Sequence, residues 1–184
     1  MTMKSSAIVR RGATAAPSTD RESRGDRHGT AEGLLEARQL LLAIAGTLSG
    51  GSPLIEWARE LADLHATLIT VAISATRRPA DFDETDTRAR VSALIGRIDE
   101  WSAFHLPRPA TGRRHTHSLG EVISHIAGTY AHMQWTLRHS DSAQHQHDAA
   151  LRFAQVQEGY ADLVDEIRSL RVLLPLGWNG IGPR

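Results

Sequence analysis

The stretch that decides the fold is residues 53–76, which read PLIEWARELADLHATLITVAISAT. Its apolar side chains recur at alternating steps of three and four, at Leu54, Trp57, Leu61, Leu64, Leu68, Val71 and Ala75. An α-helix places positions with this spacing on one face. Ser52 and Pro53 are typical of a helix start, because serine caps the first turn and proline there gives up only an unpaired N–H. The stretch therefore predicts a long amphipathic helix.

The same spacing precedes this stretch and predicts a first, shorter helix. We expect that helix to begin near Thr30, as its N-cap, and to be broken by Gly50 and Gly51. Its apolar positions are Leu34, Ala37, Leu41, Ile44 and Leu48.

Three more helices are predicted downstream. Residues 77–85 read as a polar loop, the next helix ends near His105, and the prolines in 106–117 forbid a continuous helix there. Ser118 and Glu121 then have the spacing of a capping box. The third helix carries Val91, Leu94, Ile98 and Trp101 on one face. The fourth buries Leu119, Ile123, Ile126, Tyr130, Met133 and Leu137. The last carries Phe153, Val156, Tyr160, Leu163, Ile167, Leu170 and Leu174, and Pro175 stops it.

No strand-like alternation of useful length occurs in the sequence. The prediction is therefore an all-α protein, an up-and-down bundle of four to five helices over residues 30–175. Its 184 residues suit one domain.

Both ends of the chain are predicted to be tails. Residues 1–29 hold six basic and three acidic side chains and hardly any large apolar ones, so we expect a disordered basic tail. A charge of +3 over that length could support weak nucleic-acid binding at most. Residues 176–184 form a predicted flexible tail in which Trp178 and Ile181 are apolar anchors, suited to docking on the bundle or in a partner.

Composition excludes several classes of protein. There is no cysteine, so disulfides, thiolate metal sites and cysteine nucleophiles are absent. Lys+Arg and Asp+Glu both total 21, which gives no net field toward nucleic acid or an anionic membrane. No signal-peptide or bilayer-spanning apolar run appears, so we expect a cytoplasmic protein without a membrane partner.

Ten histidines raise the question of a metal site. His125, His132 and His139 lie one heptad apart, roughly opposite the apolar stripe of their helix, which predicts an exposed row. Other histidines gather in two turns at opposite ends of that helix, about 30 Å apart. One group is His105, His115 and His117. The other is His139, His145, His147 and Asp148, and each group is a candidate site for a divalent ion or simply a polar turn. No cofactor is predicted.

His65 differs from the other histidines. It points within about 40° of the Leu61/Leu64/Leu68 stripe near the middle of the helix over 53–76, so we expect it to be buried. One interpretation is a core histidine that shares a hydrogen bond with a facing polar residue. The other is a functional group in a central cavity, with Asp63, Glu60, Thr129 and Tyr130 as companions.

No catalytic motif survives inspection. Di-iron bundles need Glu-x-x-His on two helices, whereas the nearest pattern here is Glu121-x-x-x-His125, in which the glutamate already serves as a cap. His-Glu-x-x-His and a nucleophile elbow are also missing.

Several short segments resemble a known family. They include 58–62 (ARELA), Leu64-His65, 105–107 (HLP), 118–120 (SLG) and 162–164 (DLV). Over residues 35–175 the chain resembles the actinobacterial branch of the family called domain of unknown function 4254. The resemblance implies a helical, cytoplasmic, bacterial protein and supplies no reaction. Other branches carry Trp-His-x-Glu-Asp where residues 68–76 here read LITVAISAT, so a polar site built by that stretch is not expected.

Three functional hypotheses follow from these patterns. The first is a non-enzymatic interaction or accessory protein, a homo-oligomer or a subunit of an assembly. The second is a bundle that binds a small molecule or metal in a cavity at His65, with or without enzymatic activity. The third is a weak nucleic-acid binder that acts through residues 1–29.

Overall fold

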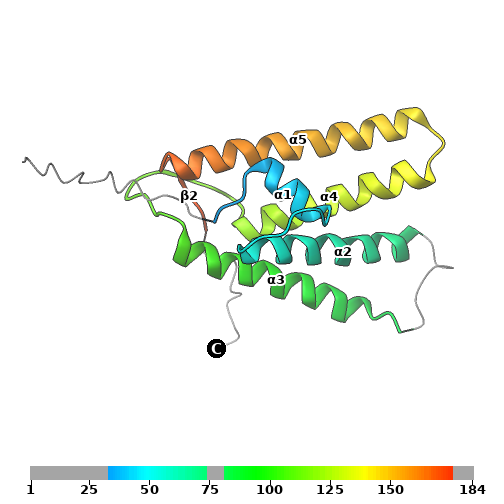
Figure 1. Ribbon diagram of the computed structural model, residues 1–184, viewed down its shortest axis with the longest axis horizontal. Coiled ribbons are helices and arrows are strands. Elements are labelled where there is room, and N and C mark those ends of the chain that lie inside the picture. Colours follow the sequence, from blue (N-terminus) through cyan, green and yellow to red (C-terminus); the bar gives the residue numbers. More distant parts are fainter. Residues whose placement is uncertain (1–32, 74–80, 176–184) are drawn as a thin grey trace, which may run out of the picture.

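Five helices make up most of the part of the chain described by the computed structural model, residues 33–73 and 81–175 (Figure 1). They are α1 (Ala37–Ile44), α2 (Pro53–Ile73), α3 (Glu84–His105), α4 (Leu119–His139) and α5 (Ala143–Arg168). The all-α bundle predicted from the spacing of apolar residues is confirmed. Across these two ranges, no helix combines the length and hydropathy that a membrane crossing requires.

The helix starts follow local capping chemistry. The capping box at α4 is present: the Glu121 amide donates to Ser118 Oγ over 3.2 Å, and the Ser118 amide donates to Glu121 Oε2 over 2.8 Å. Asp83 caps α3 by accepting from the amide of Thr85 at 2.8 Å, so this helix begins inside the segment predicted to be a loop.

The first helix is shorter than predicted. Its N-cap is Glu36 rather than Thr30, which lies outside the described residues, and Gly46 at φ +75° ends it before Leu48. Leu34 and Leu35 are buried without being helical. The carbonyl of Leu35 accepts from the Tyr160 hydroxyl at 2.8 Å, a tertiary contact that periodicity cannot anticipate.

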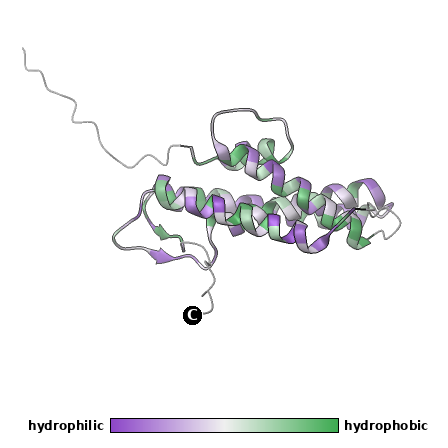
Figure 2. Ribbon diagram, turned by 90° about the horizontal axis from the view of Figure 1, so that it is seen from below, coloured by the Kyte–Doolittle hydropathy of each residue, from purple (hydrophilic) through white to green (hydrophobic). Residues whose placement is uncertain are grey.

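The last helix ends at Arg168 instead of continuing to Leu174, and two short strands were missed. β2 (Val172–Leu173) pairs in parallel with β1 (Arg113–Arg114) after Leu170 reverses the chain at φ +56°. In Figure 2, β1 is hydrophilic and β2 hydrophobic, in keeping with the exposed β1 and the buried Val172. Strands of two residues are too short to show an alternating pattern.

α4 is the central helix of the bundle. It packs on α2, α3 and α5, and α1 packs on α2 and α5. α3 and α5 therefore flank α4 and α2 on opposite sides (Figure 1). The most deeply buried large side chains include Leu54, Leu61, Ile98, Leu119, Ile123 and Tyr160.

The bundle is less tightly closed toward the turn between α4 and α5. Leu137 was predicted to be buried but is 44% exposed, and Ile73 at the end of α2 is 48% exposed. Leu68 and Val71 are only half-buried, although they continue the apolar stripe of α2. At this end the apolar faces are only partly covered, because the helices that could cover them diverge (Figure 1).

Candidate functional site

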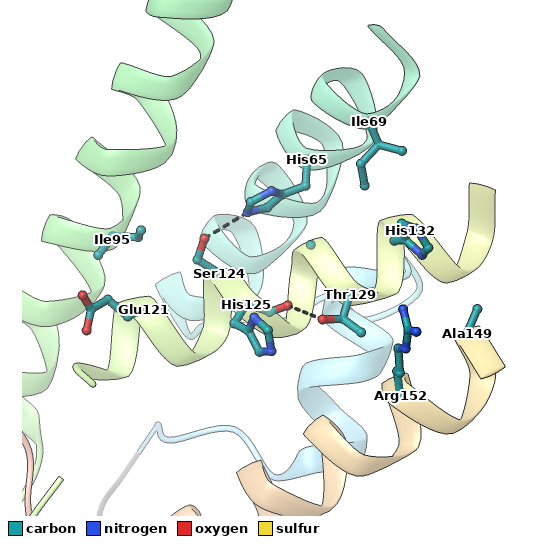
Figure 3. A pocket seen from close by; sticks show the side chains of 11 residues that line it. His65, Ile69, Ile95, Glu121, Ser124, His125, Thr129, His132, Ala149 and Arg152 are labelled. Carbon is teal, nitrogen blue, oxygen red and sulfur yellow. Dashed lines mark hydrogen bonds between the residues drawn. The ribbon is translucent and has the colours of Figure 1, made fainter. Parts of the chain in front are cut away.

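His65 lies on α2 and faces α4, as its position in the helix predicts. Its Nε2 is 2.9 Å from Ser124 Oγ, and the two side chains share a hydrogen bond (Figure 3). A Cβ atom on Gly128 would lie only 3.3 Å from His65 Nδ1. Glycine at that position therefore lets the imidazole ring lie against the backbone of α4.

The ring is half-buried, not fully buried as predicted. Burial lowers the pKa of His65 below its ordinary value of 6.5, and electrostatic interactions with His125 and Arg88 lower it further. The imidazole is therefore held in its neutral form near neutral pH.

The predicted companions of His65 lie mostly elsewhere. Glu60 forms an ion pair with Arg90 at 3.0 Å. Asp63 is exposed, and with Tyr130 it borders a separate hollow between α2 and α4. Of the four residues proposed, Thr129 alone lines the same groove as His65. Asp63 lies about 200° around the helix from His65, which explains why it faces away.

Ser124 is the partner that the sequence reasoning missed. A signal for it was present, because Gly120, Ser124 and Gly128 recur every four residues and give α4 one face of small residues. A Cβ atom on Gly120 would lie 2.4 Å from the carbonyl oxygen of Ile95 in α3. Small residues on this face allow both α2 and α3 to approach the backbone of α4 closely.

An open groove of about 550 Å³ lies beside the His65–Ser124 pair. It draws side chains from four helices, α2 through α5 (Figure 3). Ile69, Ile95 and Ala149 supply apolar surface. The polar and charged side chains that line it are His65, Ser124, Thr129, His125, His132, Arg152 and Glu121.

Charge is distributed unevenly along the groove. Glu121 lies beside α3 (Figure 3) and is engaged in the cap of α4, with His117 Nδ1 3.6 Å from its Oε2. Arg152 and His132 lie at the other end, close to Ala149 (Figure 3). Arg152 forms no ion pair within residues 33–73 and 81–175.

The His65–Ser124 pair does not have the geometry of a nucleophilic centre. Ser124 is only 6% exposed, and it lies within α4, where the neighbouring amides bond to the preceding helical turn. Amides used in this way cannot stabilise an oxyanion. No acidic side chain in the described segments hydrogen-bonds to the imidazole to orient it, as a triad requires. The pair is suited to binding rather than to acyl transfer.

The exposed histidine row is confirmed, because His125, His132 and His139 are all exposed. The candidate metal group in the turn between α4 and α5 is not assembled. Among the residues with described positions, no three His, Asp or Glu side chains are gathered so that they could hold a metal ion. His139 instead stacks on Trp135 with ring centroids 4.7 Å apart, and Asp148 Oδ1 accepts from the side-chain Nε2 of Gln144 at 2.7 Å. His145 borders the same hollow as these two, whereas His147 does not.

The two predicted tails cannot be placed on this site. Residues 1–29 lie outside the described residues, and so do Trp178 and Ile181 in the C-terminal tail.

Comparison with protein-family models, with curated proteins and with solved structures gives no match. The resemblance to the family called domain of unknown function 4254 stays a prediction. The groove must therefore be interpreted from its own chemistry.

Proposed function

We propose that this protein binds a small organic molecule in the groove at His65. The observation that supports this is a hollow of about 550 Å³ in which one hydrogen-bonded polar pair lies among the apolar side chains of Ile69, Ile95 and Ala149. Binding sites for small molecules typically have this volume, an apolar lining and a few convergent polar groups. A titratable group with a perturbed pKa, here His65, is a further common property of such sites.

Groove filling tests this proposal. Gly128→Val places branched carbon atoms where a Cβ atom already comes within 3.5 Å of three atoms of the His65 ring. Saturation-transfer NMR with a library of small aromatic and aliphatic fragments is expected to find compounds that bind the wild type and lose binding to this variant. Cross-peaks of the His65 imidazole should shift when those fragments are added to the wild type.

The matched control is Gly96→Val on α3, where an added Cβ atom meets nothing within 4 Å. Both changes replace glycine by valine within a helix, so they share the same change in helix propensity. The proposal fails if no fragment binds the wild type, or if fragments bind Gly128→Val as well as they bind Gly96→Val while both variants remain folded by circular dichroism.

A second candidate function is the interaction protein suggested by the long helices. The observation that favours it is Phe104 in the last turn of α3, whose side chain is 79% exposed. An exposed aromatic ring is a common anchor at protein interfaces. If Phe104 mediates self-association, light scattering should give a mass above 20.1 kDa for the wild type and a smaller one for Phe104→Ser.

Nucleic-acid binding through residues 1–29 and a cytoplasmic location stay predictions. Deletion of residues 1–29 tests the first of these: unchanged affinity for a mixed-sequence duplex would eliminate it.

A further inference from the structure

We infer that the ligand of the groove is an organic anion, whose carboxylate or phosphate lies between Arg152 and His132 and whose hydrocarbon body lies on Ile69 and Ile95. This inference rests on the proposed function, because it names the class of molecule that the same groove takes.

Arg152 and His132 converge from two helices. Arg152 extends from α5 toward α4, and His132 lies above its guanidinium on α4 (Figure 3). Both side chains line the His65 groove and also the adjoining hollow toward the turn between α4 and α5. A guanidinium offers parallel N–H donors that match the two oxygens of a carboxylate or the oxygens of a phosphate.

No acidic group in the described structure already neutralises Arg152. Glu121 is the acidic side chain that lines the groove, and it is held at the α3 end by the cap of α4. Asp148 borders the adjoining hollow, where its carboxylate accepts from Gln144 and forms no ion pair with Arg152. Arg152 is exposed and has no ion-pair partner within residues 33–73 and 81–175, so its guanidinium is available to an anionic ligand.

Arg152 is the arginine that lines the groove. The other nitrogen bases in the lining are imidazoles, His65 on α2 and His125 and His132 on α4, and burial favours the neutral form of His65. Arg88 on α3 does not line the groove and is paired with Glu84 at 2.7 Å. Arg152 is therefore the groove's cation that is available to a ligand.

The apolar side chains decide that the anion has an organic body. Ile69 and Ile95 lie on the His65 side of the groove, and Ala149 lies beside Arg152 (Figure 3). An inorganic ion would leave this surface in contact with water, whereas a hydrocarbon body would cover it, which is favourable because apolar surface is then removed from water. Ile69 lies toward the His132 end of the groove and Ile95 at the α3 end near Glu121, so apolar surface extends along the groove from Arg152 and fits an amphipathic acid (Figure 3).

Three probes test the ligand class: 3-phenylpropanoate, its neutral amide 3-phenylpropanamide, and phenyl phosphate. Titrations followed by NMR on the wild type are expected to give a dissociation constant about tenfold lower for the acid than for the amide. Arg152→Gln should weaken binding of both anions about tenfold and leave the amide unchanged. Tighter binding of phenyl phosphate than of the carboxylate would assign a phosphate ester, and the reverse order would assign a carboxylic acid.

Arg138→Gln is the matched control. Arg138 is an exposed arginine on α4 that bonds only to Gln134 of its own helix, at 3.4 Å, among the described residues, and it borders a different hollow. Its replacement removes the same charge from the molecule and should not change the binding of any probe.

Two results would overturn the inference. One is that the amide binds the wild type as tightly as the acid does, and that Arg152→Gln and Arg138→Gln change the dissociation constants equally. In that case the groove binds small molecules but does not select anions. The other is fragment binding that Gly128→Val abolishes, together with no binding of either anion. If no fragment and no probe binds the wild type, the proposed function fails as well.

Discussion

His65 and Asp99 show how burial decides the chemistry of single residues in this bundle. Each faces α4 and makes a hydrogen bond to it: His65 with the side chain of Ser124, and Asp99 with the amide of Gly120 at 2.7 Å. The ionisation of each group should therefore be linked to folding. Lowering the pH should reduce the unfolding free energy through His65 and increase it through Asp99.

For His65, the pKa in the folded state lies below the ordinary value of 6.5 because burial and nearby positive charges disfavour the imidazolium. The unfolded chain then binds more protons than the folded chain as the pH falls below about 6.5. His65→Gln is expected to reduce the loss of unfolding free energy between pH 7 and pH 5, measured by urea titration at each pH. His147→Gln, at an exposed position, should leave that slope unchanged.

Asp99 is 4% exposed, and its burial raises the pKa of the carboxyl group, although the bonds from Gly120 and Ser118 oppose that rise. A raised pKa means that the group contributes most below its unfolded value and that this contribution falls as the pH rises through the folded value. Asp99→Asn, which retains an acceptor for Gly120, removes this contribution, so the unfolding free energy from urea titrations should fall more steeply than in the wild type as the pH is lowered into the acid range.

Asp99→Ala leaves the buried amide of Gly120 without its acceptor and should lower the unfolding free energy by about 2 kcal/mol. The control is Glu100→Ala, one residue along α3 and exposed, which is expected to change stability by less than about 0.5 kcal/mol. Equal effects of the two alanine variants in urea titrations would contradict this role for Asp99.

At the scale of elements, α4 determines how closely its neighbours approach. Gly120 lies against α3 and Gly128 against the His65 ring of α2. Together with Ser124 they form one face, so a change in size at any of them alters a helix-helix distance and not merely a side-chain contact.

Gly120→Ala is expected to destabilise the protein by about 3 kcal/mol, because a Cβ atom there would lie 2.4 Å from a backbone carbonyl of α3 that cannot move alone. Gly96→Ala on the open face of α3 should instead stabilise by about 0.5–1 kcal/mol through helix propensity. Thermal unfolding of the two variants checks the difference in sign. If Gly120→Ala were as stable as the wild type, α3 could not lie as close to α4 at Gly120 as the structure places it.

At the scale of the whole molecule, one hydrogen bond joins parts of the chain that are 125 residues apart. The hydroxyl of Tyr160, a side chain 1% exposed, donates to the carbonyl of Leu35. This bond ties the extended segment before α1 to α5 and covers that side of the core.

Tyr160→Phe removes the donor but retains the ring, so we expect a loss of about 1–2 kcal/mol in unfolding free energy. Hydrogen exchange should increase at the amides of residues 34–40 more than elsewhere. Tyr130→Phe serves as the control, since the Tyr130 ring packs on Phe153 at 5.5 Å and its hydroxyl has no corresponding bond in the described residues. If exchange in Tyr160→Phe increased by the same factor at all amides, the bond from Tyr160 to Leu35 would not stabilise residues 34–40 specifically.

The sequence alone determined the helical architecture, because helix periodicity, caps and proline breaks depend on residues within one or two turns of each other. The apolar stripe at 54–64, the capping box at Ser118 and the inward face of His65 were all predicted for this reason. Only the tertiary structure decided the partner of His65, the two short strands and the groove. The partner of His65 depends on how closely α2 approaches α4, which Gly128 permits, and the strands depend on the meeting of segments 113–114 and 172–173, which are far apart in the sequence.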